Sequence, residues 1–336
     1  MVVKSPYLMF LGDAADELAA KVAMGVHYWR PDWCVGQLRL GNCIADLGLP
    51  DMCIKDAVSA GCRTMVIGVA NRGGVIPETW IQTIIEALES KLDVASGLHN
   101  RLVDIPAVAE AARVNDCKLI DVRHPDRVFT VANGVKRTGK RLLTVGTDVS
   151  VGKMFTSLAI EREMLARKFK AKFVATGQTG IFIAGDGVAV DAVISDFISG
   201  ATEWLSPSKQ SDHWDIIEGQ GSLFHTSYSG VTLGLIHGSQ PDALVLCHDT
   251  ERSEMRGLPG RTPPDLTECI EANEWAARIV NPKARVIGVS LNTKSMEQDE
   301  AERYIADTEN SLGLPVCDPV RSSIGPIVDK LSSYAS

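Results

Sequence analysis

The sequence lacks the cysteine patterns that mark a structural metal site or a disulfide framework. Its eight cysteines are scattered, with no C-x-x-C pair and no cysteine and histidine cluster at zinc-ligand spacing. We therefore expect no bound metal. The cysteines are expected to be reduced, buried, small apolar side chains, as in a protein of the cytoplasm.

The sequence also lacks long apolar runs and an excess of basic residues. No apolar run of about 18 residues occurs, and acidic side chains come too early for a signal peptide, so we expect a cytoplasmic protein without a membrane partner. A formal net charge of -8 argues against a surface that coats nucleic acid. With 45% hydrophobic and 23% charged residues, the composition is that of a soluble globular protein.

Short apolar runs alternate with amphipathic stretches, which predicts an α/β fold whose parallel sheets carry helices on both faces. At 336 residues the chain exceeds one typical domain, so we expect two. A charged, turn-rich segment at 124–140 indicates the connection, and we place the boundary near residue 135. The prediction is a Rossmann-like domain over 1–135 and a P-loop-like, doubly wound domain over 136–336.

The expected elements follow from the apolar periodicity. In the first domain we expect strands at 7–11, 64–69 and 119–122, a shorter element at 94–97, and helices at 14–24, 77–92 and 105–113. In the second we expect strands at 142–145, 172–175, 215–217, 243–247 and 285–291, and helices at 154–168, 188–204, 265–280 and 297–312.

One stretch of the second domain has the layout of a phosphate-binding loop. A buried strand, a turn with two glycines, a lysine and an amphipathic helix follow one another directly. Backbone N–H groups of such a turn converge on an anion, while the helix N-terminus and the lysine add positive charge. The alternative is an ordinary strand-to-helix turn. The residues are Gly146, Thr147, Asp148, Val149, Ser150, Val151, Gly152 and Lys153.

This loop departs from the common nucleotide-hydrolysing pattern in two ways. Five residues separate Gly146 from Gly152 where the common pattern has four, and Met154 follows the lysine where a serine or threonine is usual. That hydroxyl normally holds the magnesium ion, which a thioether does not do. We therefore expect pyrophosphate binding without cleavage.

Polar, glycine-containing or charged residues also follow other strands, at the edge where open parallel sheets bind ligands. Glu218 suits a metal-held carboxylate or a general base, and alternatively a helix-capping or salt-bridging acid. The N–H groups of Gly219 and Gly221 could face an oxyanion, or belong to a tight turn. Histidines 225, 237 and 248 are each a possible base or a structural side chain. The segments that follow these strands are 177–180, 218–222, 248–252 and 292–294.

The loop after the 243–247 strand carries Arg252, Arg256 and Arg261, braced by glycine and proline. Arginine forks bind carboxylates bidentately, and a stiff loop holds them in place. The alternative is that these arginines lie on the surface and pair with Glu251 and Glu254.

Several of these motifs resemble those of known protein families. Residues 146–153 resemble the phosphate loop of dethiobiotin synthetase. Gln178, Thr179 and Gly180, together with the segment 218–221, look like its second and third motifs, and Asn292 is similar to its adenine-reading asparagine. Over nearly the whole chain, the sequence more specifically resembles a former domain-of-unknown-function family that pairs a Rossmann-like domain with a P-loop-like domain. Its characterised activity is D-glutamate N-acetyltransferase of the DgcN type.

The resemblance implies acetyl transfer from acetyl-CoA to D-glutamate or a similar acidic D-amino acid. It implies that the phosphate loop and Asn292 bind acetyl-CoA, and that Gln178, Thr179 and the arginine loop bind the acceptor. The base would be Glu218, His225 or Asp249. The alternatives are an ATP-dependent ligase or kinase of the dethiobiotin synthetase type, against which Met154 counts, and a non-catalytic nucleotide-binding module. We expect a homo-oligomer, and a dimer is the commonest symmetric form.

Overall fold

The structure is a computed structural model that describes residues 2–17, 19–70, 74–125 and 127–334. It divides into two compact α/β units. The first consists of Met1–Val128 and Gly177–Ala192, and the second of Phe129–Thr176 and Val193–Ser336. Each unit contains a sheet in which every strand pair is parallel, which confirms the predicted α/β class.

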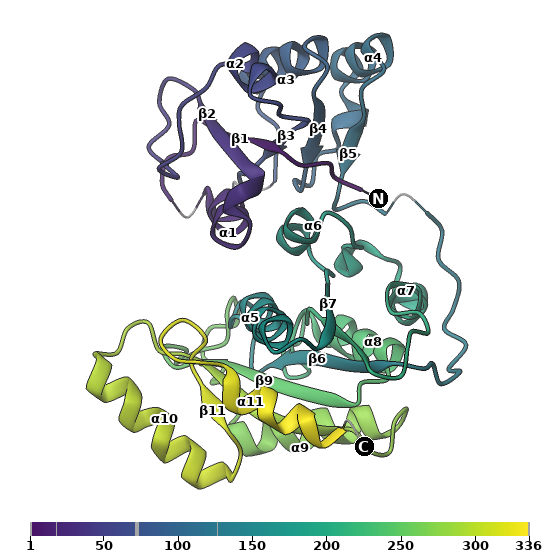
Figure 1. The fold of residues 1–336 in the computed structure, drawn as a ribbon, viewed down its shortest axis with the longest axis vertical. Coiled ribbons are helices and arrows are strands. Elements are labelled where there is room, and N and C mark those ends of the chain that lie inside the picture. Colours follow the sequence, from purple (N-terminus) through teal and green to yellow (C-terminus); the bar gives the residue numbers. More distant parts are fainter. Residues whose placement is uncertain (1, 18, 71–73, 126, 335–336) are drawn as a thin grey trace. The chain divides into compact units, whose positions relative to one another are not determined.

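The N-terminal unit is a three-layer sandwich around a five-stranded sheet of order β2-β1-β3-β4-β5. Strand β1, which lies between β2 and β3, is buried along its whole length because helices cover both faces. In Figure 1, α2, α3 and α4 lie on one face of this sheet, and α1 and α6 lie on the other. The strands are β1 (Tyr7–Gly12), β2 (Cys34–Arg39), β3 (Thr64–Ile67), β4 (Asp93–Ser96) and β5 (Leu119–Asp121), and the helices are α1 (Lys21–Trp29), α2 (Ile54–Ser59), α3 (Glu78–Glu89), α4 (Pro106–Asn115) and α6 (Gln178–Ala184).

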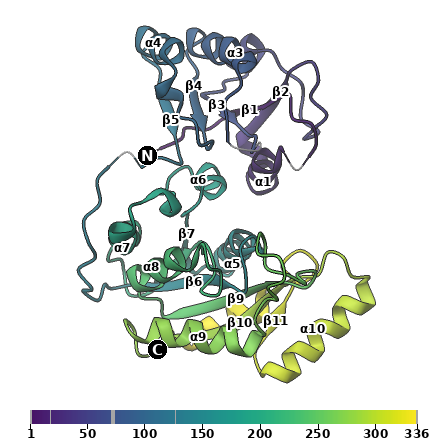
Figure 2. The same cartoon turned by 180° about the vertical axis from the view of Figure 1, so that it is seen from behind.

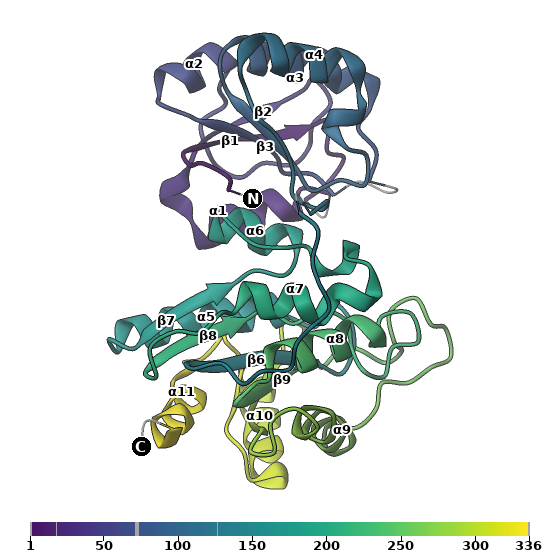
Figure 3. The same cartoon turned by 90° about the vertical axis from the view of Figure 1, so that its right-hand side faces the viewer.

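Helix α6 comes from a distant part of the sequence, yet it packs inside this first unit. It lies beside α1 (Figure 3), and the buried hydroxyl of Tyr7 donates a hydrogen bond to the carbonyl of Phe182 at 3.1 Å. A Cβ added to Gly97 would lie 2.3 Å from Oε1 of Gln178, so that side chain packs against the backbone just past β4. The first unit is therefore completed by a segment that the sequence analysis assigns to the second domain.

The C-terminal unit is built on a six-stranded sheet of order β11-β10-β9-β6-β8-β7. Helices α5 and α11 cover the face seen in Figure 1, and α8 and α9 cover the face seen in Figure 2. The strands are β6 (Lys140–Gly146), β7 (Lys170–Val174), β8 (His213–Ile217), β9 (Ala243–Asp249), β10 (Arg285–Asn292) and β11 (Val316–Cys317), and the helices are α5 (Lys153–Ala166), α7 (Ile198–Leu205), α8 (Ser229–Ser239), α9 (Leu266–Arg278), α10 (Gln298–Leu312) and α11 (Gly325–Leu331).

Several elements differ from the sequence prediction. The helix expected at 188–204 is limited to α7, which follows two short 3-10 turns, and the helix expected at 14–24 begins only at Lys21. Strand β2 and helices α2, α6, α8 and α11 were not expected at all. Over the described residues, no helix combines the length and apolarity needed to span a membrane.

Candidate active site

The strand order of the second unit brings distant loops together at one edge. Strand β6 pairs with β8 on one side and with β9 on the other. The chain places β7 and β8 on one side of β6 and then β9, β10 and β11 on the other, so the strand order reverses at β6. In open parallel sheets, this switch point opens a crevice at the carboxyl ends of the strands. The phosphate loop after β6 is therefore flanked by the loop that begins at Glu218 and by the carboxyl end of β9.

The phosphate loop is compact and turns through left-handed backbone conformations. Ser150 has φ 56° and Gly152 has φ 95°, the latter directly before α5. Lys153 folds back over the loop, and its Nζ donates a hydrogen bond to the carbonyl of Asp148 at 2.8 Å. A Cβ added to Gly146 would lie 2.9 Å from that Nζ, so the lysine needs a glycine at this position.

Lys153 is buried, and this changes its titration. Burial lowers its pKa to about 8, although the nearby side chains of Cys247, Asp148 and Glu218 act in the opposite direction. A buried ammonium group without a full counter-charge is costly. A phosphate group beside Nζ would supply that charge, so the loop fits an anionic ligand.

The loop after β8 is locked against β6. The Glu218 side chain is 4% exposed, and its Oε2 accepts the N–H of Thr176 at 2.9 Å. The N–H of Gly219 donates to Oγ1 of Thr144 at 2.9 Å, so it does not face an oxyanion as one of our hypotheses suggested. A Cβ on Gly219 would lie 1.7 Å from the carbonyl oxygen of Thr144, so only glycine lets the loop approach this closely.

The carboxyl end of β9 places His248 and Asp249 beside the phosphate loop. Nδ1 of His248 lies 2.9 Å from Oγ1 of Thr147, and burial lowers the pKa of this imidazole below its ordinary value. The carboxylate of Asp249 accepts the N–H of Glu251 at 3.2 Å, and its other oxygen lies 3.4 Å from Arg252. The pairing of His248 with Thr147 was not foreseen, although its position at a strand end was a signal.

His225 is placed as a structural side chain. Its Nδ1 accepts the N–H of Ser227 at 3.2 Å, and its Nε2 donates to the carbonyl of Arg256 at 3.0 Å. The ring is 2% exposed. With both nitrogens engaged, the neutral imidazole has no lone pair left for a substrate proton. This arrangement disfavours His225 among the three candidate bases.

The arginines of the loop after β9 have different surroundings. The guanidinium of Arg252 lies 3.5 Å from Asp148 and 3.4 Å from Asp249, so it holds the loop to the phosphate loop. Arg256 and Arg261 are exposed, and among the described residues their guanidinium groups have no ion-pair partner. Glu251 pairs with Lys294 instead, at 3.7 Å. Two arginine forks therefore remain available to a carboxylate.

The remaining predicted site residues lie on other elements, and Asn292 is in register with Asp249 across the β10–β9 pair. Asn292 ends β10, beyond β9, and its Oδ1 accepts the N–H of Lys294 at 3.3 Å. Gln178 and Thr179 open α6, which packs with the first unit. Among the described residues, no group of three or more histidine, cysteine or acidic side chains could hold a metal ion.

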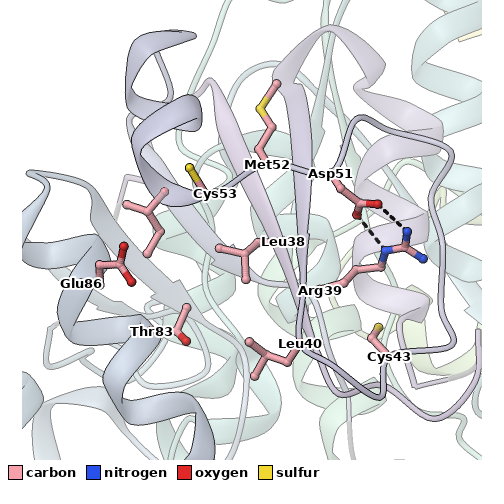
Figure 4. Close-up of a pocket in the computed structure, with 10 residues that line it drawn as sticks. Leu38, Arg39, Leu40, Cys43, Asp51, Met52, Cys53, Thr83 and Glu86 are labelled. Atoms are coloured by element: carbon pink, nitrogen blue, oxygen red, sulfur yellow. Dashed lines mark hydrogen bonds and ion pairs between the residues drawn. The ribbon is translucent and has the colours of Figure 1, made fainter.

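The first unit contains a separate cavity of about 680 Å³ next to β2 (Figure 4). Arg39 lines it, but its fork is bound to Asp51 at 2.8 and 2.5 Å, and Asp46 lies 3.3 Å away. A carboxylate or phosphate ligand would have to displace these acids. The cavity is therefore a poor site for an anion.

Comparison with known proteins assigns the family. The family described as a domain of unknown function, P-loop domain (DUF1611_C), matches residues 130–328. The family described as a domain of unknown function, Rossmann-like domain (DUF1611_N), matches residues 40–125. The chain belongs to the DUF1611 family. The predicted pairing of a Rossmann-like with a P-loop domain is thereby confirmed.

Members with names or structures resemble the chain over its full length. A protein named D-glutamate N-acetyltransferase from Tritonibacter scottomollicae is 52% identical over 99% of this chain and 100% of its own. A protein with the same name from a Pseudoalteromonas species is 46% identical over 98% of this chain and 100% of its own. The crystal structure of a DUF1611 family protein from Anabaena variabilis is 31% identical, with a TM-score of 0.86, over 98% of this chain and 100% of its own. The predicted family is confirmed.

Proposed function

We propose that this protein is an N-acetyltransferase that transfers the acetyl group of acetyl-CoA to the amino group of D-glutamate or a similar acidic D-amino acid. One observation carries the proposal. A buried lysine loop suited to phosphates lies against a loop with two unpaired arginine forks, and Asp148 contacts both loops. The full-length likeness to two proteins named D-glutamate N-acetyltransferase supports it.

The phosphate loop would bind the donor. Coenzyme A carries a pyrophosphate that must be held but not cleaved, which suits a loop with Lys153 and with Met154 in place of a metal-binding hydroxyl. The loop amides and Lys153 would bind the phosphates, and Asn292 would lie toward the adenine. No metal is required in this scheme.

The arginine loop would bind the acceptor. D-Glutamate has two carboxylates, and arginine recognises such a group with two parallel hydrogen bonds. Arg256 and Arg261 are the candidates with unpaired forks among the described residues. Arg252 would instead hold the arginine loop in place, because its guanidinium group already pairs with Asp148 and Asp249. Gln178 and Thr179 remain proposed contacts of the acceptor.

Glu218 would be the general base. It would take a proton from the substrate ammonium, so that the neutral amine attacks the thioester carbonyl. The nitrogen of the tetrahedral intermediate would lose a second proton as the intermediate collapses to the amide, and the departing thiolate of coenzyme A would take up that proton. Asp249 is the second candidate, although Arg252 and a backbone amide already bind it.

The test is a direct assay of the purified protein. We expect free thiol release from acetyl-CoA that depends on D-glutamate, and a product with the mass of N-acetylglutamate. Glu218→Gln should lose most of the rate while Asp249→Asn keeps more of it. Turnover that requires ATP and magnesium, with no use of acetyl-CoA, would contradict the proposal and favour the ligase alternative.

We also propose that the enzyme works in the cytoplasm, as its cysteine pattern indicates. A dimer is the proposed assembly, because two-fold dimers are the commonest closed form. Light scattering after size-exclusion chromatography would measure the mass, and a monomer would contradict this assignment.

A further inference from the structure

The backbone N–H and the backbone carbonyl of Arg256 are both hydrogen-bonded to side chains from other loops. Its N–H donates to Oδ2 of Asp148 at 2.7 Å, and its carbonyl accepts from Nε2 of His225 at 3.0 Å. Asp148 is 0% exposed and His225 is 2% exposed. Buried hydrogen bonds of this kind, one of them to a carboxylate, fix geometry strongly.

Asp148 also belongs to the phosphate loop and contacts its lysine. Its backbone carbonyl accepts Nζ of Lys153 at 2.8 Å, and its Oδ1 accepts the N–H of Val149 at 2.7 Å, which fixes the side chain. Nε2 of His225 lies 4.0 Å from the same Oδ1. Asp148 therefore contacts both Lys153, which would bind the donor, and the arginine loop, which would bind the acceptor.

We propose that Asp148 and His225 are positioning residues that couple binding of acetyl-CoA to recognition of the acceptor carboxylate. The inference rests on the proposed function. Donor phosphates would compete with the Asp148 carbonyl for Nζ of Lys153. The backbone of Asp148 would therefore change position when the donor binds. Because its carboxylate holds the N–H of Arg256, the arginine loop is set by the same event.

The consequence is a reciprocal change in affinity. If donor binding orders the arginine loop, the donor tightens acceptor binding, and the acceptor tightens donor binding by the same factor. Couplings of this kind are typically about 5- to 150-fold. Each substrate would then bind best to the complex that already holds the other.

A matched pair of variants tests the contribution of His225. His225→Gln keeps an N–H donor near the position of Nε2, whereas His225→Met has similar length and no donor. D-Glutamate binding would be measured by calorimetry with and without S-ethyl coenzyme A, which does not react. We expect at least about fivefold tighter binding with the donor analogue in wild type and in His225→Gln, and little coupling in His225→Met. The KM for D-glutamate should rise in His225→Met, with donor affinity nearly unchanged.

A second measurement on wild type does not depend on the folding of any variant. Hydrogen–deuterium exchange of the peptide covering 252–261 should slow when S-ethyl coenzyme A binds. Unchanged exchange, or equal coupling in both variants, would overturn the inference while leaving the proposed function intact. If the analogue does not bind at all, the proposed function fails, and the inference fails with it.

Discussion

At the scale of single residues, Lys153 makes donor binding depend on pH. Its pKa is lowered to about 8 by burial, so above that pH the free protein holds a neutral amine. Phosphates favour the ammonium form, so binding must then take up a proton, and affinity for acetyl-CoA should fall by up to about tenfold per pH unit above 8. Calorimetry of S-ethyl coenzyme A in two buffers of different ionisation enthalpy would detect the proton. Lys153→Arg, which stays charged, should remove the pH dependence, and a similar slope in that variant would contradict the assignment.

Removing the charge tests the same residue more directly. Lys153→Ala should weaken acetyl-CoA binding by about 1.5–3 kcal/mol, or about ten- to a hundred-fold, because a charge-assisted hydrogen bond to phosphate is lost. Equilibrium titration measures this. Wild-type affinity in Lys153→Ala would place the donor elsewhere.

The unpaired arginine forks predict where acceptor specificity lies. Arg256→Lys or Arg261→Lys keeps the charge but loses the bidentate geometry, so the KM for D-glutamate should rise about tenfold or more, with donor affinity nearly constant. Discrimination against acceptors without the side-chain carboxylate should fall in the same variant. Arg252→Lys is the comparison, because its aspartate contacts predict a loss of thermal stability as well. Unchanged kinetics in both the 256 and 261 variants would show that another residue binds the acceptor carboxylate. Arg72, our next candidate, lies outside the described residues.

At the scale of elements, α8 depends on glycine. A Cβ on Gly238 would lie 2.3 Å from the carbonyl oxygen of Ser199 in α7, whereas Gly230 in the same helix has nothing within 4 Å. Gly238→Ala should therefore cost about 1–3 kcal/mol of unfolding free energy through overpacking. Gly230→Ala should be neutral or stabilise by up to about 1 kcal/mol, because alanine favours helix. Urea denaturation of both variants measures the difference, and equal stabilities would refute the close approach of α7 and α8.

At the scale of the whole molecule, the reaction should proceed through a complex of both substrates. Cys247, near Lys153, is fully buried, its thiol pKa is raised to about 11 by burial, and it donates to Thr156 at 3.4 Å, so it is not placed to carry the acetyl group. Initial-rate plots should intersect, as for direct transfer. Parallel lines, or an acetylated enzyme detected by mass spectrometry, would show a covalent route.

The same site should not hydrolyse ATP at a useful rate. Met154 stands where a metal-binding hydroxyl is usual, and the hydroxyl of Thr156 lies 2.8 Å from that of Ser290, inside the buried core. Phosphate release with ATP and magnesium should stay at the level of a Lys153→Ala control. Release that exceeds this control and requires the acceptor would contradict the assignment.

The sequence by itself determined the elements whose signals are local. The strand β6, the phosphate loop and α5 follow one another within a short stretch, and apolar period, glycine positions and the lysine all act over that distance. The arginine loop was visible for the same reason. Helix α8 was not, because its glycines and small polar residues have weak helix propensity, and it is stabilised by packing against α7, α9 and β6.

Only the tertiary structure decided which of these residues meet. Asp148 and Arg256 are 108 positions apart, and they touch because the sheet places β9 beside β6. His225 was one candidate base from the sequence, whereas the structure places hydrogen-bond partners on both of its ring nitrogens. Likewise α6 follows a strand of the second unit and packs in the first. Such contacts depend on strand order and burial, which no local sequence pattern encodes. Local patterns therefore identified the chemical groups of the site, and only the tertiary structure determined which of these groups are in contact.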